Sequence, residues 1–248
     1  MRQIGLFCGT FNPIHSGHLL VAECARDQFD LEKVIFITSA RPPHRHDVSL
    51  ASTDRHAMVS AAIADNPFFE ASTCEIDREG PSYTVDTIKY FADLYGDECV
   101  FSLLLGGDNI IHLRTWHKIE EIYRCCRLLI APRFSETLGD SHAEGGAHEG
   151  VHLEGTSEAF TLSRPSSALS DLERRVLKGA NYELIDFPFL EISSSAIRRR
   201  IKEGHSILYM VPKAVSEMIA KRQYYHDNSS GETGSDRAIE KQLRGDPN

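Results

Sequence analysis

The stretch GTFNPIHSGH, from Gly9 to His18, decides the fold of this chain. It follows a short apolar run, Ile4 to Phe7, and precedes a segment, His18 to Phe29, whose apolar residues recur at helical spacing. A buried strand, a glycine-containing turn and a helix in this order are typical of the start of an α/β nucleotide-binding domain. Because glycine has no side chain, Gly9 lets a ligand approach the backbone closely. The stretch therefore predicts a ligand site where the first strand meets the first helix.

The rest of the chain alternates between strand-like and helix-like patterns. Further strands are predicted over residues 33–38, 69–76, 100–105, 127–131 and 182–187, and further helices over 53–64, 83–95, 119–123, 170–177, 192–202 and 212–222. The strand KVIFIT at 33–38 is almost continuously apolar, which is typical of parallel strands buried on both faces. Pro212 is expected in the first turn of the last helix, a favoured position for proline. We therefore expect an α/β fold, a Rossmann-like parallel sheet with helices on both faces.

The domain organisation follows from changes in composition along the chain. Residues 133–170 are rich in Gly, Ser, Glu and His and have few large apolar side chains, so we expect a flexible insertion there. Residues 226–248 contain no aromatic residue and many Ser, Gly and Asp, which predicts a disordered tail. Residues 1–225 are expected to form a single domain around the insertion.

Composition and charge exclude several classes of partner. The formal net charge is −9, which argues against binding to a nucleic-acid polymer, because such binding depends on Lys and Arg neutralising phosphates. No apolar run approaches the ~18 residues of a membrane span. The amino terminus enters the first strand directly and leaves no room for a signal peptide, so we expect a cytoplasmic protein. The six cysteines include no C-x-x-C pair and are expected to be reduced core residues. The sequence leaves a homo-oligomer open.

His15 and His18 lie three residues apart at the predicted start of the first helix. Both imidazoles would then lie on the same side as the unpaired backbone N–H groups of the first turn. Amide donors, the positive end of the helix and two imidazoles together suit a phosphate. Two alternatives remain open: a His-x-x-His metal pair, for which no third ligand is evident, and a purely structural helix cap.

A second anion site is predicted at Ile192 to Arg200. Ser193 and Ser194 stand where N-cap residues are expected, and their hydroxyls and nearby N–H groups favour a bound anion. Arg198 follows about one turn later, so its guanidinium can reach a phosphate at the helix end. The alternative is an ordinary capped helix with a solvated basic face.

The two motifs together resemble known signatures. Gly9 to His18 is similar to the GTFxPxHxGH signature of the HxGH nucleotidyltransferases, and Ile192 to Arg198 to their ISSTxIR signature, with Ser195 where Thr is common. Three further segments resemble those of bacterial nicotinate-nucleotide adenylyltransferases: Pro43-His44-Arg45, Pro81 to Thr87 (PSYTVDT), and Gly106-Gly107-Asp108 followed by Thr115-Trp116-His117. The resemblance covers about residues 3–131 and 182–222, and it implies the HUP-like variant of the Rossmann fold.

The resemblance also implies a reaction and a set of site residues. The expected reaction is adenylyl transfer from ATP to nicotinate mononucleotide, giving nicotinate adenine dinucleotide and pyrophosphate in NAD biosynthesis. His15, His18 and Arg198 are expected to be catalytic. ATP is expected to contact Gly9, Thr10, Phe11, His18, Arg45, Gly106, Asp108, Ser193, Ser194 and Arg198. The nicotinate nucleotide is expected to contact Thr10, His44, Thr84, Asp108, Trp116 and His117. Mg²⁺ is expected on the triphosphate, held mainly by phosphate oxygens and water, with no protein metal ligands.

Alternatives remain for several of these roles. Trp116, the only tryptophan, suits stacking on a pyridine ring but can also be a core residue. Asp108 can be a helix N-cap, and His44 and Arg45 can lie in a solvated loop. His117 stands where the family often has Tyr, which bears on the choice between acid and amide substrates. Rival functions are transfer to nicotinamide mononucleotide or another phosphorylated acceptor, and a non-catalytic nucleotide sensor.

Overall fold

The computed structural model describes residues 1–43, 48–132, 169–188 and 190–226. The strands are β1 Arg2–Gly9, β2 Lys33–Thr38, β3 Phe69–Ser72, β4 Cys99–Gly106, β5 Arg127–Ala131 and β6 Tyr182–Leu184. The α-helices are α1 Ser16–Gln28, α2 Ser52–Ile63, α3 Cys74–Asp77, α4 Thr84–Tyr95, α5 Ile119–Cys125, α6 Asp171–Val176, α7 Ser194–Lys202 and α8 Lys213–Arg222. Two 3₁₀ segments, η1 Gly96–Glu98 and η2 Gly107–Thr115, flank β4.

The strands form one parallel sheet in the order β3-β2-β1-β4-β5-β6. The chain first moves outward from β1 to β3 and then returns to the other side of β1 with β4. The direction of winding therefore reverses between β1 and β4. In open α/β sheets, ligands bind at the carboxyl ends of the strands at such a reversal. The carboxyl ends of β1 and β4 are followed by Gly9 to His18 and by Gly106 to Asp108, so both predicted ligand segments lie at this edge.

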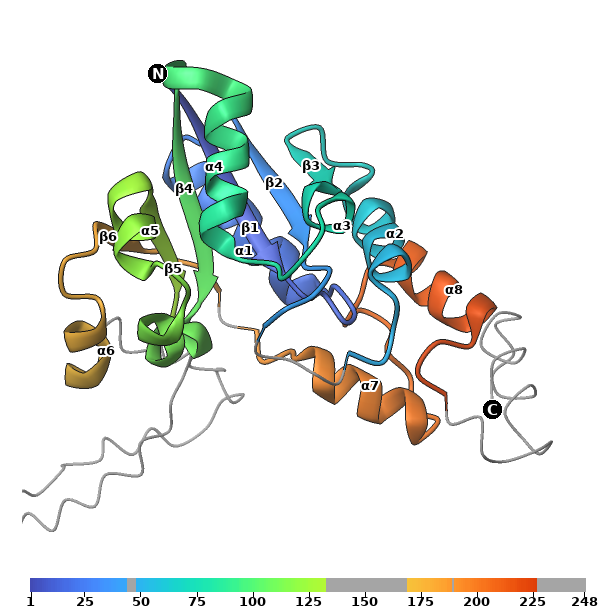
Figure 1. The fold of residues 1–248 in the computed structure, drawn as a ribbon. Helices are drawn as coiled ribbons and strands as arrows, with labels where there is room; N and C mark the ends of the chain where they lie inside the picture. Colours follow the sequence, from blue (N-terminus) through green and yellow to red (C-terminus); the bar gives the residue numbers. More distant parts are fainter. Residues whose placement is uncertain (44–47, 133–168, 189, 227–248) are drawn as a thin grey trace, which may run out of the picture.

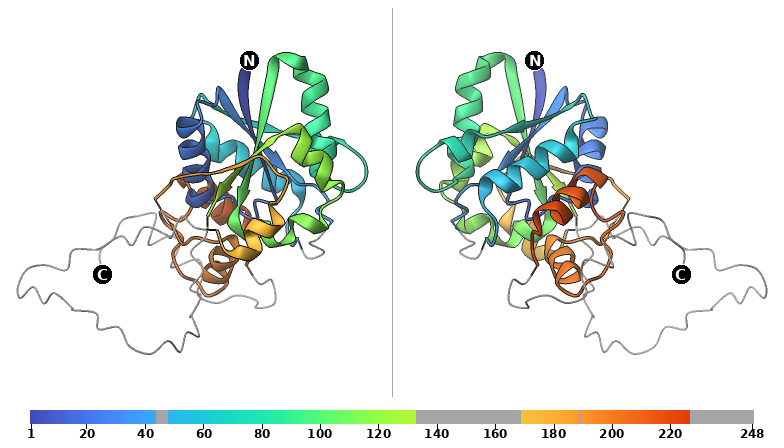
Figure 2. Two further views of the ribbon diagram at one scale, coloured as in Figure 1. Left: turned by 90° about the vertical axis from the view of Figure 1, so that its left-hand side faces the viewer. Right: turned by 90° about the vertical axis from the view of Figure 1, so that its right-hand side faces the viewer.

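Helices cover both faces of the sheet. The helices α1, α2 and α8 pack on one face and α4 and α5 on the other (Figures 1 and 2). Neighbouring side chains on a strand point to opposite faces. On β2, Phe36 accordingly belongs to the core under α1 and α2, whereas Ile35 belongs to the core under α4. Helix α7 lies beyond the carboxyl ends of the strands, where it faces the predicted ligand edge (Figure 1).

The predicted fold class is confirmed, and most elements lie within two residues of their predicted limits. The strand predicted over 69–76 is wrong in its second half, because β3 ends at Ser72 and the short helix α3 follows. The Ser72 hydroxyl accepts a hydrogen bond from the Cys74 N–H at 3.3 Å, and such local bonds compete with strand pairing. The strand predicted over 182–187 ends earlier, at Leu184. Pro212 is the N-cap of α8 and not a first-turn residue.

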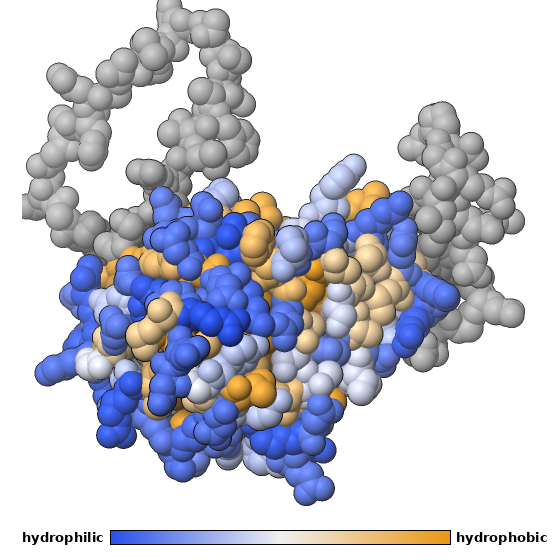
Figure 3. Space-filling view, turned by 90° about the horizontal axis from the view of Figure 1, so that it is seen from above, coloured by the Kyte–Doolittle hydropathy of each residue, from blue (hydrophilic) through white to orange (hydrophobic). Residues whose placement is uncertain are grey.

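The described surface agrees with the composition. Seen from above, at the amino ends of the strands, it is mostly hydrophilic, with apolar side chains in small patches (Figure 3). Within the described residues, no helix is both long and apolar enough to cross a membrane. The insertion predicted at 133–170 and the tail predicted at 226–248 lie outside the described residues, except for Leu169, Ser170 and His226.

The six cysteines form no disulfide. Cys74 and Cys126 are buried, and burial raises the pKa of the Cys126 thiol to about 12. Burial likewise raises the pKa of the Cys8 thiol. Such thiols stay protonated and pack as small apolar groups. Cys125 differs from the prediction, because its side chain is exposed at the end of α5.

Candidate active site

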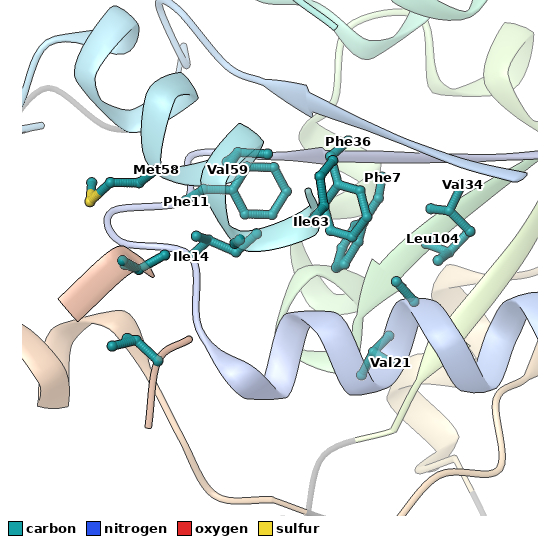
Figure 4. Packing of buried hydrophobic residues seen from close by; sticks show 14 of the residues in the cluster. Phe7, Phe11, Ile14, Val21, Val34, Phe36, Met58, Val59, Ile63 and Leu104 are labelled. Atoms are coloured by element: carbon teal, nitrogen blue, oxygen red, sulfur yellow. The ribbon is translucent and has the colours of Figure 1, made fainter. Parts of the chain in front are cut away.

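The turn after β1 is shaped by the packing of Phe11. The Phe11 ring is buried among side chains of α2, including Val59 and Ile63 (Figure 4). A Cβ on Gly9 would lie 2.7 Å from this ring, so the turn requires glycine at position 9. The glycine therefore makes room for Phe11, which differs from the predicted close approach of a ligand. The Phe11 side chain is 3% exposed, so the backbone of this residue is the part open to the predicted contact with ATP.

Phe11 has a left-handed backbone, with a φ of +46°. This conformation costs a non-glycine residue roughly 1–2 kcal/mol. Backbone strain of this kind is retained where the surroundings enforce it, and it is concentrated at functional sites. The buried ring holds one side of the turn in place.

The two histidines of the motif stack on each other at the start of α1. Their ring centroids are 3.6 Å apart, and His15 is the N-cap residue of the helix. A Cβ on Gly17 would lie 3.1 Å from His15 Nδ1, so glycine at position 17 leaves room for this ring. The backbone N–H of His15 donates to His18 Nδ1 at 3.2 Å. Since Nδ1 accepts, the neutral His18 ring carries its proton on Nε2, which makes Nε2 a hydrogen-bond donor.

The second motif contacts the first. Ser193 caps α7, and its hydroxyl accepts from the Ala196 N–H at 3.2 Å. The Ser194 hydroxyl donates to the Pro13 carbonyl at 2.8 Å, and Arg198 Nη1 donates to the Asn12 carbonyl at 2.7 Å. The amino ends of α1 and α7 therefore meet at the same turn. Two positive helix ends and the Arg198 guanidinium form a strong local field for an anion.

Tyr225 is a site residue that the sequence analysis missed. Its hydroxyl donates to Asn12 Oδ1 at 2.8 Å, and burial raises its pKa well above the usual range. Arg55 is a second one: it is buried in α2, and Nη1 donates to the Thr10 carbonyl. The signal for Arg55 was an arginine on an otherwise apolar helix face. For Tyr225 no sequence signal exists, because it follows the last helix.

The carboxyl end of β4 carries the second ligand segment. A Cβ on Gly106 would lie 2.6 Å from Asp108 Oδ1, so glycine lets this carboxylate fold back over the strand end. Asp108 is exposed in the first turn of η2. The N-cap residue of η2 is Gly106, so the alternative prediction of Asp108 as a helix N-cap is wrong. Asp108 follows the carboxyl end of β4, the strand that neighbours β1, so it lies at the same edge of the sheet as the turn after β1.

The residues predicted for the pyridine ring come from two segments that meet. Tyr83, next to Thr84, stacks on His117 with ring centroids 4.3 Å apart. Trp116 is half-buried and packs against the core between the sheet and α4, so it combines core packing with a partly exposed ring. Thr84 opens α4, whose first-turn N–H groups suit a carboxylate. The start of α4 and the end of η2 therefore form one wall.

Ser82 joins this wall to the loop after β2. Its buried hydroxyl accepts from the backbone N–H groups of Ala40 and Arg41, at 3.0 and 3.1 Å. The Ser82 N–H in turn donates to the Arg41 carbonyl at 3.0 Å. This residue was also missed, although it lies inside the PSYTVDT segment. His44 and Arg45, predicted for the same loop, lie outside the described residues.

Through His56 of α2, the stability of the folded chain is expected to depend on pH. Its Nδ1 lies 3.3 Å from the Thr38 hydroxyl at the end of β2, and burial lowers its pKa. The folded chain then binds its proton less readily than the unfolded chain, so stability is lost as the pH falls below about 6.5, the unfolded value. We expect the fall in Tm between about pH 7.5 and 5.5 to be smaller in His56→Asn than in the wild type, measured by calorimetry. An unchanged fall would contradict this assignment.

Comparison with known proteins identifies the family of the chain. The model of the cytidylyltransferase-like family matches residues 6–200. A probable nicotinate-nucleotide adenylyltransferase of Moorella thermoacetica is 38% identical over 230 residues, which cover 92% of this chain and 94% of that protein. One of Thermoanaerobacter sp. is 37% identical over 226 residues, covering 90% of this chain and 94% of that protein.

Solved structures show the same fold. The Plasmodium falciparum nicotinic acid mononucleotide adenylyltransferase complexed with NaAD superposes with a TM-score of 0.63, at 18% identity, over 91% of this chain and 98% of that chain. A putative nicotinate-nucleotide adenylyltransferase of Vibrio parahaemolyticus gives a TM-score of 0.59, at 18% identity, over 94% of this chain and 100% of that chain. From the family match and the identity along its length, the chain belongs to the nicotinate-nucleotide adenylyltransferases within the cytidylyltransferase-like family.

Proposed function

We propose that this chain transfers the adenylyl group of ATP to nicotinate mononucleotide and releases pyrophosphate, a step of NAD biosynthesis. The observation that carries the proposal is the meeting of the two motifs, where Arg198 of α7 donates to the carbonyl of Asn12 in the turn before α1. This contact brings two helix amino ends and a guanidinium to one turn. The wall of aromatic side chains adjoins the loops after β2 and β4, at the same edge of the sheet. The first group of features suits phosphates and the second suits a pyridine ring.

The chemistry is an in-line displacement at phosphorus. A phosphate oxygen of the mononucleotide attacks the α-phosphorus of ATP, the bond from this phosphorus to the β-phosphate oxygen breaks, and pyrophosphate leaves with the electron pair. Phosphoryl transfer of this kind needs positioning and charge stabilisation, and it needs no covalent enzyme intermediate. His15, His18 and Arg198 are assigned to this stabilisation, with the His18 Nε2–H as a donor. The backbone of Gly9 to Phe11 and the amides of Ser193 and Ser194 hold phosphates.

The acceptor is assigned to the wall formed by α4 and η2. Trp116 stacks on the pyridine ring, and its carboxylate is held by Thr84 and the first N–H groups of α4, with His117 beside it. Thr10 and Asp108, at the ends of β1 and β4, hold the nucleotides between the two halves of the site. Gly106 leaves room at the strand end. His44 and Arg45 are proposed to close over the phosphates from the loop after β2.

Mg²⁺ is proposed to enter with ATP. Within the residues that the structure describes, no group of three His, Cys, Asp or Glu side chains is arranged to hold a metal ion. The ligands that we assign to the ion are phosphate oxygens and water, which is the usual arrangement for Mg²⁺ with nucleotides. Bound in this way, Mg²⁺ supplies neutralisation of the triphosphate charge. The side chains named above then orient the α-phosphate.

The proposal is tested by pyrophosphate release from Mg-ATP, with nicotinate mononucleotide, nicotinamide mononucleotide and phosphopantetheine offered separately. We expect release with nicotinate mononucleotide at a kcat/KM well above that with either of the others. Preference for another acceptor would overturn the substrate assignment and leave the phosphate site in place. Release with none of them would favour a nucleotide sensor.

Replacement of Trp116 tests the acceptor wall. Stacking of an aromatic side chain on a base contributes about 1–3 kcal/mol, so Trp116→Ala is expected to raise the KM for nicotinate mononucleotide about 10-fold or more. The KM for ATP should change little, because ATP is assigned to the other half of the site. Trp116→Phe, which keeps an aromatic ring, should recover most of the loss. Equal increases in both KM values would instead indicate a core role for Trp116.

A further inference from the structure

Arg55 is a buried arginine without a carboxylate partner. Its side chain lies in α2 and is 1% exposed. Nε donates to the Leu50 carbonyl at 3.2 Å, Nη2 to the Ser39 carbonyl at 2.7 Å, and Nη1 to the Thr10 carbonyl. All three acceptors are neutral backbone groups. Among the described residues, Arg55 forms no ion pair.

A buried charge without a counter-charge is unusual. Ionised groups inside proteins are normally paired, since desolvation of an unpaired charge is unfavourable. Burial lowers the pKa of Arg55, but an arginine side chain keeps its proton in proteins. Within the described chain, the guanidinium therefore brings a positive charge beneath the turn after β1 without a carboxylate to balance it. A ligand of opposite charge at this turn would provide the balance.

The bond to Thr10 also sets the direction of a backbone donor. The peptide between Thr10 and Phe11 is planar and trans, so its carbonyl and N–H point in opposite directions. Because the Thr10 carbonyl points to the buried guanidinium, the Phe11 N–H points away from it. Phe11 has the left-handed backbone described above, and the Arg55 bond holds the peptide that leads into it. Ser39 ties the same region together, since its N–H donates to the Gly9 carbonyl at 2.9 Å.

We propose that Arg55 is a positioning residue for the triphosphate of ATP, which fixes the Thr10–Phe11 peptide and supplies a buried positive charge that the phosphates balance. This inference rests on the proposed function, in which ATP occupies the turn after β1. Arg55 is expected to act on ATP more than on the acceptor, because the peptide that it holds, Thr10–Phe11, lies in the turn assigned to phosphates. It touches no substrate atom itself, so its effect passes through the turn.

The test compares Arg55→Met and Arg55→Lys with the wild type in steady-state kinetics for both substrates. In Arg55→Met we expect the KM for ATP to rise between about 10- and 100-fold, the range for loss of a charged hydrogen-bonding group. The KM for nicotinate mononucleotide should stay within about threefold, a split that a general loss of structure would not produce. Arg55→Lys keeps the charge and loses the three-way contact. Its KM for ATP should therefore lie between that of the wild type and that of Arg55→Met.

A binding measurement and a matched control complete the design. Calorimetric titration with Mg²⁺ and α,β-methylene-ATP, in the absence of any acceptor, should show the same loss of affinity as the KM for ATP. Arg26→Met is the control, because Arg26 of α1 is a partly buried arginine that is paired with Glu23 at 2.8 Å. It should bind the analogue like the wild type.

Two results would overturn the inference. One is an affinity of Arg55→Met for the analogue that equals that of the wild type. The other is a KM for ATP and a KM for nicotinate mononucleotide that rise by the same factor in Arg55→Lys. If Arg55→Met does not fold, Arg55→Lys alone decides between the outcomes. Failure of the proposed function is seen separately: the wild type would bind the analogue but would release no pyrophosphate from Mg-ATP in the presence of nicotinate mononucleotide.

Discussion

His18→Ala is expected to lower kcat by about 10²–10³-fold, the usual effect of removing one donor that stabilises charge in a transition state. The Nε2–H of His18 is the donor concerned, since Nδ1 already accepts the His15 N–H at 3.2 Å. The KM for ATP should change less than kcat, because the charge on the α-phosphate grows as the reaction proceeds. Single-turnover measurements with Mg-ATP and nicotinate mononucleotide give the rate of the chemical step directly.

A second variant separates catalysis from helix capping. Removal of the Nδ1 acceptor from the first turn of α1 costs about 1 kcal/mol of stability, as for other cap residues. His18→Asn keeps a short acceptor near Nδ1 and lacks Nε2, so it should regain stability without regaining turnover. His205→Ala is the control, because His205 is exposed and lies beyond α7. Turnover like that of the wild type in His18→Asn would remove His18 from the mechanism.

Arg198→Met is expected to lower kcat/KM for ATP by about 10³-fold, comparable to the removal of other arginines that neutralise a transferring phosphoryl group. Two effects combine here: the guanidinium charge is lost, and so is the 2.7 Å bond that holds the Asn12 carbonyl. Arg198→Lys keeps the charge but loses the planar fork of donors, so it should restore only part of the activity.

The neighbouring arginine provides a matched control for this experiment. Arg199 is exposed on the same helix, so Arg199→Met should leave kcat/KM within about twofold of the wild type. Thermal unfolding of both variants shows whether α7 remains in place. If Arg198→Met and Arg199→Met reduce the activity equally, the basic face of α7 acts as a general field and Arg198 has no specific role.

The strands could be predicted from the sequence because buried parallel strands are nearly continuous apolar runs. The pattern KVIFIT at 33–38 and the run at 127–131 match β2 and β5 residue for residue. The pairing of the two motifs was also predictable, since both carry the residue types of an anion site at a helix start. The end of β3 was not, because it depends on several local hydrogen bonds, among them the one from the Cys74 N–H to the Ser72 hydroxyl.

The supports of the site were harder to predict because they depend on contacts that are distant in sequence. Tyr225 lies 213 residues from Asn12, its hydrogen-bond partner. The reason why position 9 requires glycine could not be predicted either, since it depends on where the Phe11 ring packs. Arg55 was within reach: it shares one helix face with Met58, Val59 and Ala62, and a charge on such a face indicates a buried polar contact.

The central claim, adenylyl transfer to a nicotinate nucleotide, is tested most directly by competition. Equal concentrations of nicotinate and nicotinamide mononucleotide are offered to the full chain with limiting Mg-ATP, and the two dinucleotide products are separated and identified by mass. Their ratio equals the ratio of the two kcat/KM values. We expect nicotinate adenine dinucleotide to predominate, and the two dinucleotides together to equal the pyrophosphate released. Predominance of the nicotinamide product, or ATP consumption without either dinucleotide, would contradict it.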